Sequence, residues 1–353
     1  MLFRSVVPGL GALPGEDLKL LQGDNTFGLM MTTVGQPLTQ LVKIRAGTKA
    51  AEQDVRIAEQ DRRRAENEIG LKVKEAYLGA LVLEGRIEAA RRETEAAEEA
   101  AREAGDAVQT GAELRVKQLE AEARLLEKQN AILSATIQLA DLRSDLADAI
   151  GLPPGTDLEL VPPDEPLPAL EPVEALEKAA LEANPEVRAA AATVEKARRG
   201  LAAARADYIP EVGLFATHAY QSGVPFLPSN NAAIGARMTW EVFEWGRRKA
   251  QVGERQAQLE QAEENLRRMR NRVRIDVEKT RRKVERLESL LRVAERAVEV
   301  RREARRIAAD HAELGVTSAL ALRQAEAGLA SAEAQMMEAR LGLRLAHAEL
   351  ERI

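Results

Sequence analysis

The sequence of 353 residues contains no cysteine and few aromatic residues. The lack of cysteine excludes disulfide bonds, thiolate metal sites, a cysteine nucleophile and lipid attachment through an N-terminal cysteine. Aromatic residues make up 3% of the chain, whereas Asp, Glu, Lys and Arg together make up 31%. An enzyme of this size normally carries more aromatic bulk to fill its interior. The composition is instead typical of long helices and coiled coils.

Long apolar runs and an excess of basic charge are also missing. No stretch of about 18 apolar residues occurs, so the sequence predicts no transmembrane helix. The first residues, "MLFRSVVPGLGALPGED", show no signal-peptide pattern. Transmembrane β-strands are not excluded by this, because they are only about ten residues long and only alternately apolar. The net charge of -6 arises from nearly balanced acids and bases, so we expect no nucleic acid partner.

Proline is absent from two long parts of the chain. None lies between Pro37 and Pro153 and none follows Pro228, whereas seven of the fourteen prolines crowd into residues 153–172. Because proline breaks helix interiors, this crowded segment is predicted to be a linker. The parts without proline, in which apolar side chains recur at spacings of three and four, are predicted to contain two long helices, over 38–109 and 246–313.

The two halves of the chain resemble one another. Each long helix ends near a glycine, Gly111 or Gly315, and a second helical pattern follows, over 113–150 and 317–353. The glycines are 204 positions apart, and "REAGDAVQTGAELRVKQLEAEARL" aligns at this offset without a gap with "RIAADHAELGVTSALALRQAEAGL". An internal duplication is the simplest explanation. The predicted repeats are residues 1–152 and 173–353.

The two repeats differ at their starts. The second begins with a predicted helix over 173–207 and two strands, over 210–222 and 231–243. The first has only a strand over 26–37, preceded by a loop or remnant strand over 1–25. We therefore expect the natural product to be longer at its N-terminus, with a leading helix and most of a first strand absent from this chain.

The predicted strands and their ends hold most of the aromatic residues. Residues 210–222 and 231–243 alternate between apolar and polar side chains, and "SGVPFLPSNN" between them has loop composition. A small β-sandwich between the helices would explain this pattern as well as membrane strands would. However, so few strands cannot close a barrel or cover their own edges, so we expect several chains to share one sheet. The aromatic residues expected at a membrane interface are Tyr208, Phe215, Tyr220, Trp240, Phe243 and Trp245.

Six segments of the duplicated chain resemble the TolC-like outer-membrane efflux protein family. "GQPLTQL" (35–41) and "WEVFEWGRRKA" (240–250) are similar to its two strand-to-helix joints. "VKEAYLGAL" (73–81) is similar to its mid-helix signature, and "NPEVRAAAATVEKARRG", from Asn184, to the helix that leads into a strand. "TGAELRVKQLEAEA" and "LGVTSALALRQAEA" are similar to its periplasmic tips. The resemblance covers nearly the whole chain.

This resemblance implies a mainly α-helical protein with a small β part. Long antiparallel helical hairpins would form an α-barrel in the periplasm, and the strands would join a transmembrane β-barrel shared by a homotrimer in outer-membrane lipid. The implied function is a passive exit duct for small molecules or proteins, without enzyme activity or cofactor, in a tripartite efflux or type I secretion system. The implied partners are a periplasmic adaptor and an inner-membrane pump of the RND or ABC type. The alternative is a soluble coiled-coil scaffold without transport activity.

The expected functional residues lie at the helical turns and on a strand. Arg237 and Glu241 alternate with Met238 and Trp240, so they would line the pore if the latter two face lipid. The three histidines are far apart in sequence and predict no metal site. No catalytic set is present. The turn residues expected to dock the adaptor are Thr110, Gly111, Leu314, Gly315, Val316 and Thr317.

Overall fold

A computed structural model describes residues 28–153, 155–222 and 228–353. The predicted remnant strand over 1–25 and the first two residues of the strand over 26–37 lie outside these ranges. The chain divides into two compact units, one comprising residues up to Glu52 together with Lys196–Leu259, and the other comprising Gln53–Glu195 and Glu260–Ile353. The predicted class, mainly α-helical with a small β part, is confirmed.

The first unit contains an antiparallel sheet of three strands in the order β1-β2-β3. The strands are β1 (Gly28–Pro37), β2 (Glu211–Ser222) and β3 (Asn230–Thr239). The expected strand over 231–243 therefore ends four residues early. Its extension was wrong because the backbone turns after Thr239, and Trp245 and Gly246 adopt positive φ angles of 50° and 84°.

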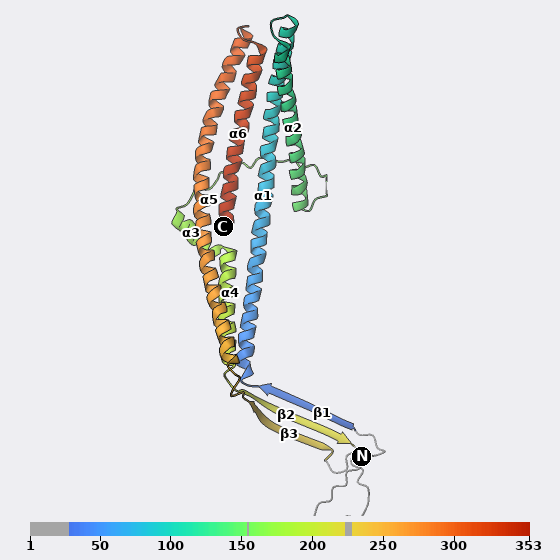
Figure 1. Ribbon diagram of the computed structural model, residues 1–353, viewed down its shortest axis with the longest axis vertical. Helices are drawn as coiled ribbons and strands as arrows, with labels where there is room; N and C mark the ends of the chain where they lie inside the picture. The colour runs from blue at the N-terminus through green and yellow to red at the C-terminus, as the bar shows by residue number, and fades with distance from the viewer. Residues whose placement is uncertain (1–27, 154, 223–227) are drawn as a thin grey trace, which may run out of the picture. The chain divides into compact units, whose positions relative to one another are not determined.

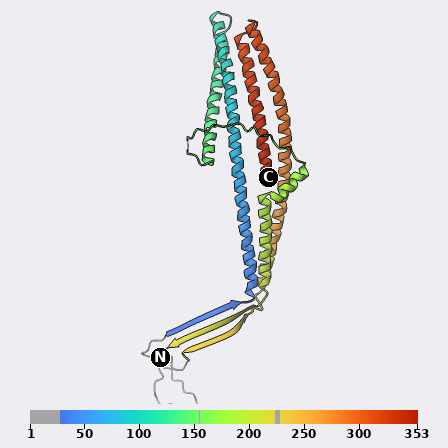
Figure 2. The same ribbon diagram turned by 180° about the vertical axis from the view of Figure 1, so that it is seen from behind.

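The second unit is built from helical hairpins. Helix α1 (Gln40–Gln109) pairs with α2 (Arg115–Ala149), and α5 (Arg247–Glu313) pairs with α6 (Ala319–Arg352). The bounds of the long helices α1 and α5 and of the second helices of the hairpins, α2 and α6, agree with the predicted bounds to within two residues at each end. Within this unit the helices lie side by side in the order α2, α1, α6, α5, and both turns lie at the same end (Figures 1 and 2).

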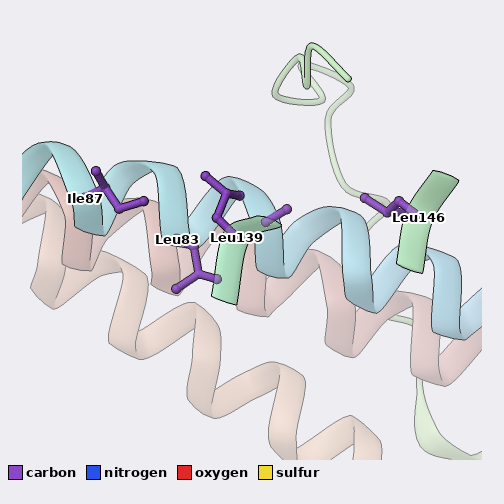
Figure 3. Packing of buried hydrophobic residues seen from close by; sticks show 5 residues of the cluster. Leu83, Ile87, Leu139 and Leu146 are labelled. Atoms are coloured by element: carbon purple, nitrogen blue, oxygen red, sulfur yellow. The ribbon is translucent and has the colours of Figure 1, made fainter. Parts of the chain in front are cut away.

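Buried apolar side chains connect each neighbouring pair of helices in this layer. Leu83 and Ile87 of α1 pack with Leu139 and Leu146 of α2 (Figure 3). A second cluster joins Leu78 and Leu81 of α1 to Leu341 of α6. A third joins α5 and α6 through Val284, Leu343 and Ala346. The Pro-rich linker contributes Leu158 and Leu160 to the first cluster, and Leu167 and Leu170 to the third. The linker is therefore part of the helical core.

The expected helix over 173–207 is two helices, α3 (Val173–Ala183) and α4 (Pro185–Ala206). The single-helix prediction was wrong because Pro185 cannot donate a backbone hydrogen bond and begins a new helix. The side-chain oxygen of Asn184 accepts hydrogen bonds from the amides of Glu186 at 2.8 Å and Val187 at 3.1 Å, which caps α4. Its amide nitrogen donates to the carbonyl oxygen of Ile353 at 2.7 Å. The residue between α3 and α4 therefore also binds the last residue of the chain.

None of the helices in the described ranges has a segment long and apolar enough to cross a membrane.

Candidate functional site

The two turns at the ends of the hairpins have the same backbone geometry. Gly111 and Gly315 have φ angles of 75° and 67°, a left-handed conformation that glycine adopts without a steric penalty. The amide of Ala112 donates to the carbonyl of Ala107 at 2.8 Å, and the amide of Val316 donates to that of His311 at 2.9 Å. These five-residue spans are the hydrogen bonds of a Schellman motif. The duplication inferred from the glycines therefore extends to the hydrogen bonding of both turns.

The turns expose apolar side chains. Leu314 and Val316 are largely exposed, as is Leu114 at the start of α2. Thr110 has a structural role, because its hydroxyl donates to the carbonyl of Asp106 at 3.0 Å. Thr317 is half-buried. The predicted docking residues thus form two small surfaces with apolar side chains at one end of the helical layer.

Charged pairs surround the turns. Lys117 and Glu120 form an exposed ion pair at 2.9 Å. Their hydrogen bond raises the pKa of Lys117 and lowers the pKa of Glu120. On α5, the guanidinium of Arg306 binds Glu303 at 2.6 Å and Asp310 at 2.8 Å. Cations and anions alternate here, so the turns do not present a field of one sign.

The joint between β3 and α5 holds both tryptophans in exposed positions. Trp245 is 90% exposed, and Trp240 and Phe243 are also exposed. The rings of Phe243 and Trp245 meet edge to face with centroids 5.0 Å apart. A left-handed φ in an exposed tryptophan has a conformational cost. The sequence predicted an aromatic joint, and the structure adds that these rings point away from the protein core.

A charged pocket lies beside this joint, entirely within the first unit. Its volume is about 410 Å³, and it is lined by Lys43, by acidic residues and by two arginines at the start of α5. Lys43 binds Asp207 at 2.5 Å and Glu211 at 3.5 Å, and the hydrogen bond to Asp207 is the main reason that the pKa of Lys43 is raised. Sequence spacing gave no sign of this cluster, since Lys43 and Asp207 are far apart in the chain.

Glu241 takes part in the same charged cluster. It binds Arg247 at 3.2 Å, and Arg248 binds Glu244 at 2.8 Å. Glu241 was expected on the same strand face as Arg237, but the alternation that placed it there ends with β3 at Thr239. The structure therefore does not bring Arg237 and Glu241 together on one strand.

Strand pairing places the other predicted pore-facing and membrane-interface residues of β2 and β3 on opposite faces of the sheet. Arg237 pairs with Gly213, two residues from Phe215, so both side chains share one face, and the guanidinium lies 5.5 Å from the centre of the Phe215 ring. Such a contact is a cation–π interaction. Met238 and Tyr220 lie on the other face. Phe215 and Tyr220, expected in one group of aromatics, are therefore on different faces.

The ring of Phe215 covers Gly235 on the neighbouring strand. A methyl group at Gly235 would lie 2.8 Å from the ring, closer than real contacts allow. Gly235 therefore provides the space in which Phe215 lies next to Arg237. The contact among Phe215, Gly235 and Arg237 was not predicted from the sequence, although a glycine inside a strand pattern is a signal for close approach of another group.

Comparison with known proteins agrees with this architecture. The sequence matches the family described as outer membrane efflux protein over residues 23–152 and 176–353. No curated protein matches it significantly. The outer membrane protein VceC from Vibrio cholerae has a similar structure, with a TM-score of 0.72, 18% identity, and coverage of 92% of this chain and 87% of that one.

Two further solved structures are similar. The open state of the MtrE outer membrane channel from Neisseria gonorrhoeae has a TM-score of 0.70 and 22% identity, covering 93% of this chain and 79% of that one. The CmeC outer membrane channel from Campylobacter jejuni has a TM-score of 0.70 and 14% identity, covering 93% of this chain and 77% of that one. At these identities the structures establish a common fold.

Proposed function

Because the chain belongs to the outer membrane efflux protein family, we propose that three copies of it assemble into one exit duct, supplied from the periplasmic side by an adaptor and an inner-membrane pump. The protein is an outer-membrane channel component of an efflux system, with its helical part in the periplasm. Its family consists of channel proteins. Transport is passive in this proposal: the duct supplies a hydrated path, and the pump supplies the energy.

The main support for a duct shared by several copies is that the described sheet has two unpaired edges. In the described residues, β1 and β3 each have an edge without a partner strand. Unpaired strand edges are sites of association with further strands. Three strands also cannot close on themselves. Pairing β1 and β3 with strands of neighbouring copies satisfies these edges, and closure of the shared sheet around a pore removes them.

The two faces of the sheet fit different surroundings. The face of Met238 also carries exposed Leu214, Ile234 and Val34, of which Ile234 is 90% exposed. Burial of such side chains in lipid is favourable. The other face holds Arg237, and Thr33 and Thr217, whose hydroxyls are 3.2 Å apart. We assign the Met238 face to lipid and the Arg237 face to the water-filled pore.

The exposed aromatic residues after β3 fit the boundary of the membrane. Trp240, Phe243 and Trp245 follow the last residue of the strand, where it passes into the charged helix α5. Tryptophan is enriched at membrane interfaces because its ring is amphipathic. Arg247, Arg248 and Glu241 then lie on the aqueous side. Tyr208 lies just before β2, so it joins the same boundary.

The adaptor is assigned to the two turns. Leu314 and Val316 expose apolar side chains around Gly315, and Thr110 and Gly111 form the matching turn of the other hairpin. Exposed apolar groups at the end of an otherwise charged helical layer are suited to a protein contact. The pump, of RND or ABC type, is assigned only through the adaptor, and the cargo is either small molecules or proteins.

The sheet assignment is tested with single labels in lipid. The absence of cysteine allows a fluorophore to be attached at one engineered cysteine in each variant, Arg237→Cys or Met238→Cys. In reconstituted vesicles, a quencher on the lipid chains should quench the label at 238 and leave the label at 237 bright. Ile234→Cys, on the Met238 face, is the matched control and should be quenched. Quenching at 237 without quenching at 238 contradicts the assignment.

The assembly is tested by light scattering. The protein mass in detergent should equal three chains, and the protein should precipitate when detergent is removed. A monodisperse monomer in plain buffer would instead favour the soluble scaffold.

A further inference from the structure

The Pro-rich linker between the repeats crosses the helical layer of the second unit (Figures 1 and 2). Side chains of the layer bind its backbone: the hydroxyl of Tyr77 on α1 donates to the carbonyl of Val161, and the guanidinium of Arg344 on α6 donates to the carbonyl of Glu165. Leucine side chains of the linker are packed into the apolar clusters on both sides of this crossing. The linker is therefore attached to the layer at several points, and the space that it encloses has a defined wall.

A pocket of about 310 Å³ lies between the linker, α1 and α6, entirely within the second unit. Part of its wall is apolar, formed by Tyr77 and Leu78 from α1 and by Leu167 with its neighbours Pro166 and Pro168 from the linker. Small-molecule sites in proteins have volumes of about 300 to 1,000 Å³. The pocket is at the lower end of this range, so it suits a ligand of about the size of an amino acid.

His347 of α6 is a buried polar side chain that lines this pocket. The residue is 6% exposed. In the part of the chain that the structure describes, its imidazole has neither a hydrogen-bond partner nor an ion-pair partner. Buried polar groups nearly always have a hydrogen-bond partner. The unpaired imidazole, which has one nitrogen that can donate, therefore indicates that a group from outside the chain binds here.

Arg344 lies three residues before His347, on the same face of α6. One of its guanidinium nitrogens is bound to the carbonyl of Glu165. Among the described residues, no carboxylate lies within ion-pair distance of this guanidinium, and its other N–H groups have no partner. A planar guanidinium is suited to binding a carboxylate. Arg344 and His347 together therefore form a site for an anionic group.

The pocket also has one carboxylate that is not paired. The side chain of Glu165 has no cationic partner in the described ranges. Lys74 and Glu351, the other charged residues of the wall, bind each other at 3.2 Å. Arg344 binds the backbone of Glu165 but not its carboxylate. One cation and one anion thus lie in neighbouring positions of the pocket without pairing with each other.

These two charges are complementary to a zwitterion. A phosphate would face the carboxylates of Glu165 and Glu351, and a metal ion would face the cations of Lys74 and Arg344. A ligand with one carboxylate and one ammonium group matches both unpaired charges. The apolar wall favours burial of an apolar side chain on the same ligand. Apolar walls with a few convergent polar groups are typical of small-molecule sites.

We propose that this pocket binds a zwitterion of amino-acid size with an apolar side chain. The ligand carboxylate lies on Arg344 and His347, and its ammonium group lies on Glu165. Its side chain packs against Tyr77 and Leu78. All of these residues belong to one copy of the chain, so the site goes beyond the shared duct and does not depend on it. Because α1 and α6 belong to different hairpins, a bound ligand would contact both hairpins and the linker.

Three probes with the same aromatic ring test the site. The full chain in detergent is titrated by calorimetry with phenylalanine, with hydrocinnamate, which lacks the ammonium group, and with phenethylamine, which lacks the carboxylate. Phenylalanine should bind with a stoichiometry of one per chain. Each of the other probes should bind at least about tenfold more weakly, because it loses one hydrogen-bonded contact between charges. A lack of saturable phenylalanine binding to protein of trimeric mass, or equal binding of all three probes, would overturn the site and leave the duct intact.

Substitutions that remove one charge test the contacts separately. Glu165→Gln, at an exposed position, should weaken phenylalanine binding at least about tenfold and leave hydrocinnamate binding unchanged. Arg344→Gln should weaken both phenylalanine and hydrocinnamate and leave phenethylamine unchanged. Arg340→Gln is the matched control, because Arg340 is on the same helix but binds Glu295, at 3.8 Å, outside the pocket. Unchanged phenylalanine binding in both pocket variants, or an equal loss in the control, would overturn the proposal.

Arg344→Gln also removes a hydrogen bond to the linker, so a second variant separates ligand binding from linker attachment. His347→Phe keeps a ring at this position and removes both nitrogens, and the bond between Arg344 and the linker remains. This variant should weaken phenylalanine and hydrocinnamate and leave phenethylamine unchanged. Unchanged binding of all probes in His347→Phe, or an equal loss of all three, would overturn the assignment of the ligand carboxylate to this side of the pocket.

Discussion

Replacement of Leu341 by alanine is expected to destabilise the helical unit by about 3 to 4 kcal/mol. The Leu341 side chain is 2% exposed and packs against Leu78 and Leu81 of α1. The substitution removes about three carbon groups, each worth about 0.8 kcal/mol of burial. The cavity left behind adds to this cost, and measured Leu→Ala changes at buried sites lie between about 2 and 5 kcal/mol. Leu341 lies at the contact between the hairpins, so the loss directly weakens their packing.

The measurement is guanidinium unfolding in detergent, followed by far-ultraviolet circular dichroism. The midpoint should fall with little change in the slope, because the surface exposed on unfolding is nearly the same. All variants need one protein concentration, since assembly contributes to apparent stability. Leu314→Ala is the control, because Leu314 is 75% exposed, and its effect should stay within about 0.5 kcal/mol. A loss below about 1 kcal/mol for Leu341→Ala, well under the range for a buried leucine, would refute the packing of α1 on α6.

Two further predictions concern the joint and the turns. Lys43→Met should reduce the loss of stability of the sheet unit at high pH. In the folded protein the hydrogen bond to Asp207 raises the pKa of Lys43. The stabilisation that the charged Lys43 contributes is therefore complete below the unfolded pKa of 10.5 and is lost as the pH rises through the folded pKa. Unfolding midpoints measured from about pH 9 to 12 should fall more steeply for the parent than for the variant, and parallel curves would contradict this. At the turns, a photoreactive amino acid in place of Val316 should capture the periplasmic adaptor in cells, whereas one in place of Ile234 should not, and capture at 234 alone would contradict docking at the turns.

The helices and their turns could be predicted because their signals are local. A chain without proline from Leu38 to Leu152 permits an uninterrupted helix, and a glycine such as Gly111 or Gly315 can end it in the left-handed conformation. The same local logic was available at Asn184–Pro185, where an N-cap residue precedes a proline. Treating this pair as the start of a motif inside one helix led to the wrong prediction over 173–207.

The end of β3 and the faces of the sheet could be predicted only in part. Alternation identified a strand, but it continues in the sequence through Phe243 while the pairing with β2 ends at Thr239. A strand exists only as long as a partner supplies hydrogen bonds, and the partner is distant in sequence. For the same reason, the contact of Phe215 with Arg237 depends on the register between two strands and on the lack of a side chain at Gly235.

The sequence by itself determined the long helices and the glycine turns, because each depends on residues close together in the chain. It also showed the duplication, because the same local pattern recurs 204 positions later. Tertiary structure alone decided which helices are inner and which are free, that Lys43 binds Asp207, and that Arg237 lies next to Phe215 of the neighbouring strand. These features depend on packing and strand register, which bring together residues that no spacing rule relates.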